Sequence, residues 1–169
     1  MEGVLWSSGR FMPVLARVGP NAQAALLLNL YGVAGGTSSE ALACETEALL
    51  RAALEYGSSL GDDVPTVLAG DLNLADASES SDVLKAVVDA QLYCNAASVA
   101  SEIGMSGADA TLVWLGKPTA LIDYVYLPRE IAYCSTAYEV REPAVGAGGA
   151  ASGRRAIGRS VCGWRSGIW

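Results

Sequence analysis

Two polar clusters in this sequence adjoin apolar runs and carry side chains that could do chemistry. The first is Gly70-Asp71-Leu72-Asn73, which follows the apolar, β-branched run 64–69. Such a run is typical of a strand covered on both faces, and a glycine after it lets the backbone turn. If the chain stays extended, Asp71 and Asn73 point to the same side, where the carboxylate could take a proton or bind a hard cation and the amide could hold an anionic oxygen. Gly-Asp-x-Asn is also an ordinary turn composition, in which Asp and Asn bond their own backbone, so both interpretations stay open.

The second cluster is a single carboxylate, Asp123, inside the apolar run 121–127. Period-two spacing places it on one face with Leu121 and Val125, while the two tyrosines of the run face the other way. A half-buried carboxylate is costly unless it is paired, so Asp123 needs a partner. It either belongs to a site or lies on an edge strand, bonded to neighbouring backbone or to a tyrosine hydroxyl.

The composition restricts the chemistry that this chain can perform. Its 169 residues suit one domain with a buried core, and its net charge is −7. Residues 1–140 carry 6 Lys and Arg against 17 Asp and Glu, whereas residues 141–169 carry 5 against 1. The body therefore lacks a broad basic footprint for nucleic acid, and a phosphate-bearing substrate would need a bound cation or local donors. The absence of histidine removes the commonest general base and the commonest transition-metal ligand.

The cysteines and the hydropathy pattern predict an intracellular protein without a membrane anchor. The four cysteines are far apart, match no zinc spacing and are expected to be free thiols in a reducing compartment: Cys44, Cys94, Cys134 and Cys162. The N-terminus does not resemble a secretory signal, and no apolar run is long enough to span a membrane.

The hydrophobic pattern predicts alternating strands and helices. We expect strands over 3–6, 11–18, 24–31, 64–69, 111–115, 120–127 and 131–140. The turn Gly19-Pro20-Asn21 should join the second and third of these into an antiparallel hairpin. A capping box from Thr37 to Glu40 should begin a helix that ends near Tyr56, and a shorter helix should cover 82–90.

The long helix should present one apolar stripe. Leu42, Leu49, Ala53 and Tyr56 recur at helical spacing, and Glu45, Glu47, Arg51 and Glu55 are expected to face water. Residues 1–141 form one predicted domain. Residues 142–169 are rich in Gly, Ala and Arg and are predicted to be a disordered tail, whose arginines either touch a polyanion or are simply solvated.

Three segments, in this order, resemble motifs of the endonuclease/exonuclease/phosphatase superfamily, which includes apurinic endonucleases and pancreatic-type deoxyribonucleases. Asn29-Leu30-Tyr31-Gly32 resembles its Asn-x-Tyr strand end, residues 70–73 resemble its Gly-Asp-Phe/Leu-Asn motif, and Ile122-Asp123-Tyr124-Val125 resembles its Ile-Asp-Tyr strand. The resemblance covers residues 26–127, about the C-terminal half of the family's domain. It implies an α/β fold, namely part of a four-layer α/β-sandwich of the deoxyribonuclease-like type, with a mixed or antiparallel sheet and flanking helices.

The resemblance also implies a phosphoesterase or nuclease that uses Mg²⁺. Asp71 would orient or deprotonate the attacking water and is a possible metal ligand, Asn73 would hold a phosphate oxygen, and Tyr31 would donate to the phosphate. Asp123 would orient a catalytic histidine, and Trp114 lies in a stretch that often borders the substrate groove. The substrate would be nucleic acid or a small phosphoester.

The sequence departs from the family in ways that leave its activity open. Nothing before Tyr31 matches the family's first-half Asn and Glu metal ligands, and no Asp-His pair follows Asp123. The Arg that often precedes Ile-Asp-Tyr is Leu121 here. The chain could thus be an incomplete enzyme that another chain completes, a catalytically inactive remnant, or a protein-binding module. Half of a face-to-face sandwich should expose an apolar sheet face, which a protein partner or a second copy could cover.

Overall fold

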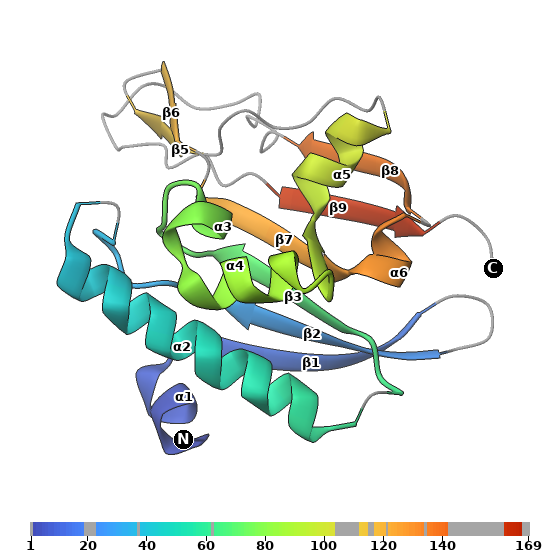
Figure 1. Cartoon of the computed structure of the whole chain (residues 1–169), viewed down its shortest axis with the longest axis horizontal. Helices are drawn as coiled ribbons and strands as arrows, with labels where there is room; N and C mark the ends of the chain where they lie inside the picture. The colour runs from blue at the N-terminus through green and yellow to red at the C-terminus, as the bar shows by residue number, and fades with distance from the viewer. Residues whose placement is uncertain are drawn as a thin grey trace, which may run out of the picture.

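A five-stranded mixed sheet with helices against it forms the body of the chain (Figure 1). The computed structural model describes residues 2–18, 23–36, 38–61, 63–103, 112–114, 117–120, 122–133, 135–141 and 161–166. The helices are α1 (Glu2–Ser8), α2 (Glu40–Ser59), α3 (Ala77–Ser80), α4 (Asp82–Asp89), α5 (Ala96–Glu102) and α6 (Arg129–Ala132). The strands are β1 (Phe11–Val18), β2 (Gln23–Leu30), β3 (Thr66–Asp71), β4 (Tyr93–Asn95), β5 (Leu112–Trp114), β6 (Lys117–Ala120), β7 (Asp123–Pro128), β8 (Ser135–Arg141) and β9 (Val161–Ser166).

The order of the strands brings distant parts of the sequence together. The sheet runs β1-β2-β3-β7-β4. β1 and β2 form the antiparallel hairpin that the pattern predicts, β2 and β3 are parallel, and β7 is antiparallel to β3. The carboxyl ends of β2 and β3 and the amino end of β7 therefore lie at the same edge of the sheet.

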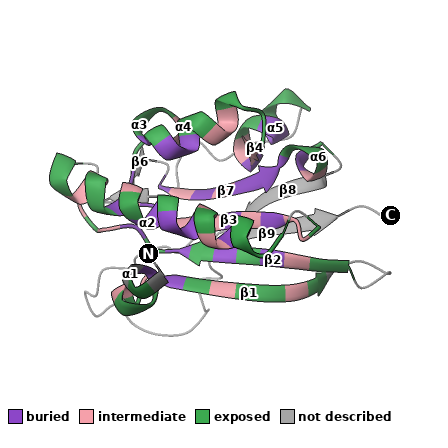
Figure 2. Ribbon diagram, turned by 60° about the horizontal axis from the view of Figure 1, so that its bottom comes forward, coloured by how far each residue is buried: buried purple, intermediate pink, exposed green. Residues whose placement is uncertain are grey.

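One face of the sheet packs on α2 and α4 and holds the core (Figures 1 and 2). Alternate residues of β2 are buried, as period-two spacing requires: Leu26, Leu28 and Leu30. Gly57, in the last turns of α2, permits close packing, because a Cβ there would lie 3.0 Å from Thr66 Cγ2 and 3.3 Å from Leu28 Cδ1. A second, smaller cluster forms where α5 and α6 meet β7, around Val99, Leu127 and Ala132.

The other face of the sheet is open over β1 and β2. Met12 is paired with Asn29 and Val14 with Leu27, so these four side chains share one face. Met12, Val14 and Leu27 are exposed, and Asn29 is exposed as well. Figure 2 shows how much of β1 is exposed. The expectation of an uncovered, largely apolar sheet face is therefore confirmed for these two strands.

The N-terminal segment is a helix, so the strand predicted over 3–6 is wrong. α1 buries Leu5 completely, and Trp6 packs edge-on against Phe11 and Tyr56, with ring centroids 5.6 and 6.0 Å apart. Phe11 and Tyr56 also pack edge-on against each other. This aromatic cluster closes one end of the core, a tertiary contact that short-range periodicity does not report.

The helix α2 does not begin at the predicted N-cap, Thr37. α2 begins at Glu40 with Ser39 as its N-cap, and Thr37 lies outside the described residues. The helix predicted over 82–90 is confirmed as α4, whose N-cap Ser81 accepts a hydrogen bond from Leu84 N at 3.1 Å. Within 131–140 a short helix, α6, precedes the strand β8.

The predicted tail contains one described segment. Residues 161–166 form β9, which pairs antiparallel with β8. Residues 142–160 and 167–169, and the turn 19–21, lie outside the described residues. In the described part of the chain, no helix combines the length and the apolar character that crossing a bilayer requires.

Candidate active site

Four polar residues lie in a row at one edge of the sheet, each at the end of a different strand. Tyr31 N donates to Arg10 O at 2.8 Å, which continues the β1–β2 register past Phe11 and Leu30. Gly32 N donates to Asp71 O at 2.7 Å, which joins the ends of β2 and β3. Asp71 is the direct partner of Asp123 across the β3–β7 pair. The order along the edge is thus Arg10, Tyr31, Asp71, Asp123, and the predicted convergence of three separated segments is confirmed.

The two carboxylates point to the face of the sheet opposite α2 and α4. Along β3 and β7 the buried side chains that face the helices are Leu68, Tyr124 and Tyr126, and strand alternation turns Asp71 and Asp123 to the opposite face. Both carboxylates are partly buried. Any ligand of this pair must therefore approach from the face that α2 and α4 leave uncovered.

Of the two interpretations of Gly-Asp-x-Asn, the structure shows the turn, because the backbone does not stay extended through Asn73. Asn73 has a φ of 51° and lies in the left-handed region. Its backbone N–H donates to Asp71 Oδ1 at 3.0 Å, which is the turn interpretation of Gly-Asp-x-Asn. The turn swings the Asn73 side chain towards the neighbouring loop, where its Nδ2 donates to Gly32 O at 3.2 Å.

The loops after β2 and β3 touch through their backbones, and glycine makes this approach possible. A Cβ on Gly32 would lie only 2.0 Å from Leu72 O, and a Cβ on Gly36 would lie 2.8 Å from Asn73 O. Val33 N donates to Thr46 Oγ1 at 2.8 Å, which anchors the same loop to α2. The position of Tyr31 relative to Asp71 is therefore set by tight packing of two loops.

Two buried tyrosines of β7 hold the loop that follows Asn73. Tyr124 Oη donates to Leu74 O at 3.0 Å and accepts from Ala77 N at 3.0 Å, and Tyr126 Oη bonds to Ser78 Oγ at 2.7 Å. Burial raises the pKa of Tyr124 and raises the pKa of Tyr126 to about 12. Both phenols therefore stay protonated at neutral pH and can keep these bonds. The sequence signal was present, because both tyrosines fall on the face of β7 opposite Asp123.

Arg10 is a residue of this edge that the sequence interpretation missed. Its guanidinium carbon lies 5.4 Å from the centroid of the Tyr31 ring, and its Nη1 donates to Gly32 O at 3.0 Å. Tyr31 itself is 46% exposed. The hairpin register could have revealed this contact, because pairing Phe11 with Leu30 places Arg10 beside Tyr31.

One predicted site residue, Trp114, lies in a separate two-stranded sheet. Trp114 is in β5, paired with Lys117 of β6, and its side chain lies outside the description. Its role in substrate binding stays a prediction.

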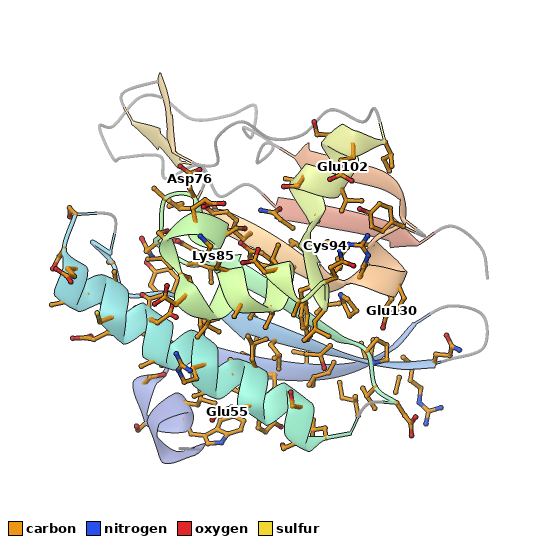
Figure 3. All side chains as sticks on the ribbon, in the orientation of Figure 1. Glu55, Asp76, Lys85, Cys94, Glu102 and Glu130 are labelled. Atoms are coloured by element: carbon orange, nitrogen blue, oxygen red, sulfur yellow. The ribbon has the colours of Figure 1, made fainter. Side chains whose placement is uncertain are left out.

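Cys94 is paired with Leu127, at the far end of β7 from Asp123, and Figure 3 shows it between Glu102 and Glu130. Burial raises the pKa of the Cys94 thiol, so it is a poor nucleophile. Cys44 and Cys94 are both free, as expected.

The donor set of the row suits Mg²⁺ but does not form a closed metal cage. Among the described side chains, no group of three or more His, Cys, Asp or Glu residues could hold a metal ion. Mg²⁺ is commonly held by one or two carboxylates together with waters and substrate phosphate, and two carboxylates stand opposite each other here. Asp71 and Asp123 thus provide the kind and number of oxygen donors that an open Mg²⁺ site needs.

Comparison with known proteins identifies the fold. The sequence matches no protein-family model and no curated protein. Among solved structures, it is similar to the catalytic domain of Xenopus laevis APE2, at a TM-score of 0.54 and 14% identity, covering 83% of this chain and 54% of that one. It is also similar to the 3'-5' exonuclease NExo of Neisseria meningitidis, at a TM-score of 0.50 and 18% identity, covering 78% of this chain and 57% of that one. The chain thus spans little more than half the length of these structures. With its five-stranded mixed sheet and flanking helices, the chain has the fold of these two nuclease structures over the part that it covers.

Proposed function

We propose that this chain is a divalent-metal-dependent phosphoesterase domain of the nuclease type, and that its site is the edge formed by Tyr31, Asp71, Asn73 and Asp123. The observation that carries the proposal is the direct pairing of Asp71 with Asp123 on the sheet face opposite α2 and α4. Two facing carboxylates are costly for a fold and useful for holding a hard cation or an attacking water. The shared fold alone would not carry this proposal, because one fold hosts many functions.

Each residue has a role that its chemistry allows. Asp71 orients or deprotonates the attacking water, and Asp71 and Asp123 together would hold Mg²⁺, which when bound supplies positive charge that offsets the charge on the phosphate. Asn73 has two amide N–H groups, of which one donates to Gly32 O, so the second can bind a phosphate oxygen. Tyr31 donates a hydrogen bond from its hydroxyl to a phosphate oxygen as negative charge builds up there.

We propose further that the site is incomplete in this chain alone. The sequence contains no histidine, so Asp123 has no imidazole to orient. A positioned acid or base typically contributes about 10²- to 10⁴-fold to the rate, and we expect a correspondingly slow reaction unless another chain supplies such a group.

The test is hydrolysis by the purified chain with Mg²⁺ on three substrates: duplex DNA with an abasic site, single-stranded DNA, and a small aryl phosphate. Asp71→Asn keeps an oxygen that can accept the Asn73 N–H, so the turn should persist while the negative charge is lost. We expect turnover that Asp71→Asn reduces at least 100-fold. Glu55→Gln is the control, because Glu55 is exposed on α2 (Figure 3). No turnover on any substrate, or equal turnover by Asp71→Asn, would contradict the proposal.

A second candidate function is a protein-binding module, and the open sheet face favours it. Met12 is 54% exposed, and Val14 and Leu27 lie beside it on the same face. A stable complex should bury this patch. Light scattering on wild type and on Met12→Glu tests the idea: an oligomer that the substitution dissociates supports it, and a monomer at high concentration counts against self-association.

A further inference from the structure

The charge changes sign along the row of residues at the sheet edge. Asp71 and Asp123 lie at one end, Tyr31 lies between, and the guanidinium of Arg10 lies at the other end. A phosphate group that approaches this edge is repelled by the carboxylates and attracted by Arg10. The row therefore has an end suited to a cation or water and an end suited to an anion.

Arg10 is held in place before any ligand arrives. Its Nη1 donates to Gly32 O at 3.0 Å, and its guanidinium lies over the Tyr31 ring at 5.4 Å. A guanidinium has five N–H donors in a rigid fork, and one bond to a carbonyl leaves donors for the oxygens of a phosphate. Fixing the fork in advance lowers the entropy cost of binding.

Four other cations whose side chains the structure describes are placed away from this row. Arg17 is seven residues further along β1, Arg51 is exposed on α2, and Lys85 is paired with Glu79 at 3.8 Å. Arg129 also lies over a tyrosine ring, that of Tyr133 at 5.3 Å, but next to the far end of β7. Moreover, Tyr133 Oη is bonded to Glu102 at 3.0 Å, so an anion that approaches Arg129 meets a carboxylate.

We propose that Arg10 and Tyr31 form an anion-binding subsite that holds the phosphoryl group of the ligand, with Asn73 contributing an amide donor at its border. The subsite deepens the proposed function and rests on it for the choice of phosphate as ligand. It supplies the local positive charge that a chain with a net charge of −7 and no histidine needs for a phosphate ligand. The phosphoryl group lies towards Arg10, so the water or cation lies on its side nearest Asp71.

Binding without hydrolysis tests the subsite. The chain is titrated without divalent metal with inorganic phosphate, an aryl phosphate monoester and a short single-stranded oligonucleotide, and amide NMR shifts are followed. We expect shifts at Gly32 and Tyr31 with millimolar affinity for inorganic phosphate that weakens as salt is added. A tenfold or greater preference for the oligonucleotide identifies a phosphodiester ligand, and equal or tighter binding of the monoester identifies a small phosphoester.

Four variants separate charge from structure. Arg10→Gln keeps an amide donor for Gly32 O and most of the length, and should weaken phosphate binding at least tenfold. Arg10→Lys keeps the positive charge but loses the forked N–H donors of the guanidinium, and should weaken phosphate binding about threefold. Tyr31→Phe removes the hydroxyl and should weaken it severalfold. Arg129→Ala removes the matched cation over Tyr133 and should leave the affinity unchanged.

The outcomes separate this inference from the proposed function. If phosphate binding depends on Arg10 but the chain shows no hydrolytic activity, the subsite is supported and the proposed enzymatic function is contradicted. If the chain hydrolyses a substrate and the KM is the same in Arg10→Gln as in wild type, the enzymatic function is supported and the subsite is overturned. The subsite is also overturned if the amide signals of wild type do not shift at phosphate concentrations up to about 50 mM. It is likewise overturned if Arg129→Ala weakens phosphate binding as much as Arg10→Gln does.

Discussion

Asp71 of β3 and Asp123 of β7 face each other directly across an antiparallel strand pair. The next pair towards the sheet edge, Leu72 and Ile122, is hydrogen bonded, with Leu72 N 2.8 Å from Ile122 O. The two carboxylates therefore occupy a non-hydrogen-bonded position, where opposite side chains come closest. Like charges at such a position lower the stability of a sheet. A bound cation would offset this repulsion.

Removing one charge of this pair should stabilise the apo chain and weaken its response to Mg²⁺. We expect Asp123→Asn to raise the free energy of unfolding by about 0.2–1 kcal/mol without divalent cations, because the like-charge repulsion is lost. Adding Mg²⁺ should stabilise wild type, since an ion that binds only the folded state favours it, and should stabilise Asp123→Asn much less. Urea denaturation with and without Mg²⁺ measures both effects, with Glu55→Gln as the control. Equal stabilisation of both proteins by Mg²⁺ would exclude Asp123 as a ligand.

The sequence predicts β1, β2 and β3 well but not β4 or β9. In β2, burial on one face leaves a period-two pattern at Leu26, Leu28 and Leu30. The sequence also places Tyr31 at the end of a strand and Asp71 just after one, but it places Asp123 inside a strand over 120–127, whereas β7 begins at Asp123. It does not specify which strands are neighbours or in what register. The resemblance to known motifs, rather than periodicity, supplied the convergence of these residues, and the register of β2, β3 and β7 now gives its structural basis.

Contacts between loops and helices could not be predicted from the sequence, because each depends on a partner far away in the chain. The turn at Asn73 is stabilised by Asp71 and by Gly32, 41 residues away. Glu47 was expected to face water, and that expectation is wrong. Its carboxylate accepts from Ser81 Oγ at 2.6 Å and from Val83 N at 2.7 Å, at the start of α4. A helical pattern shows which positions can be exposed but not whether another helix begins beside them.

Gly32 should be intolerant of any side chain. A Cβ there would lie 2.0 Å from Leu72 O, which is backbone and cannot rotate away, so the two loops must separate. We expect Gly32→Ala to lower the free energy of unfolding by roughly 1–3 kcal/mol, as overpacking usually does. Gly3→Ala is the control, because a Cβ on Gly3 in α1 has no atom within 4 Å and alanine favours helix. Urea denaturation of both variants decides the matter, and equal stability would show that the loops can relax without cost.

Glu47 should contribute more to stability than any other carboxylate of α2. Glu47→Ala removes the acceptor for Ser81 Oγ and Val83 N, and bonds to a charged group are worth about 1.5–3 kcal/mol, so we expect a loss of roughly 2–3 kcal/mol. Glu47→Gln keeps one carbonyl acceptor and should lose less. Glu45→Ala, at an exposed position of the same helix, should change stability by less than about 0.5 kcal/mol. Chemical denaturation of the three variants tests this order, which similar losses in Glu45→Ala and Glu47→Ala would contradict.

Tyr126 should make the fold sensitive to alkali in a defined window. Burial raises the pKa of its phenol from 10.0 to about 12, so below pH 10 the hydroxyl is protonated in both the folded and the unfolded chain. Between pH 10 and about 12 only the unfolded chain releases the proton, and the free energy of unfolding falls by at most roughly 1.4 kcal/mol per pH unit from this group. Tyr126→Phe should be less stable at neutral pH, because it loses the bond to Ser78, yet its stability should fall less steeply over that window. Ser78→Ala breaks the same bond but keeps the buried phenol, so it should retain the steep fall. Denaturant titrations at pH 8, 10 and 11 compare the three proteins, and an unchanged slope in Tyr126→Phe would assign the alkaline loss to other groups.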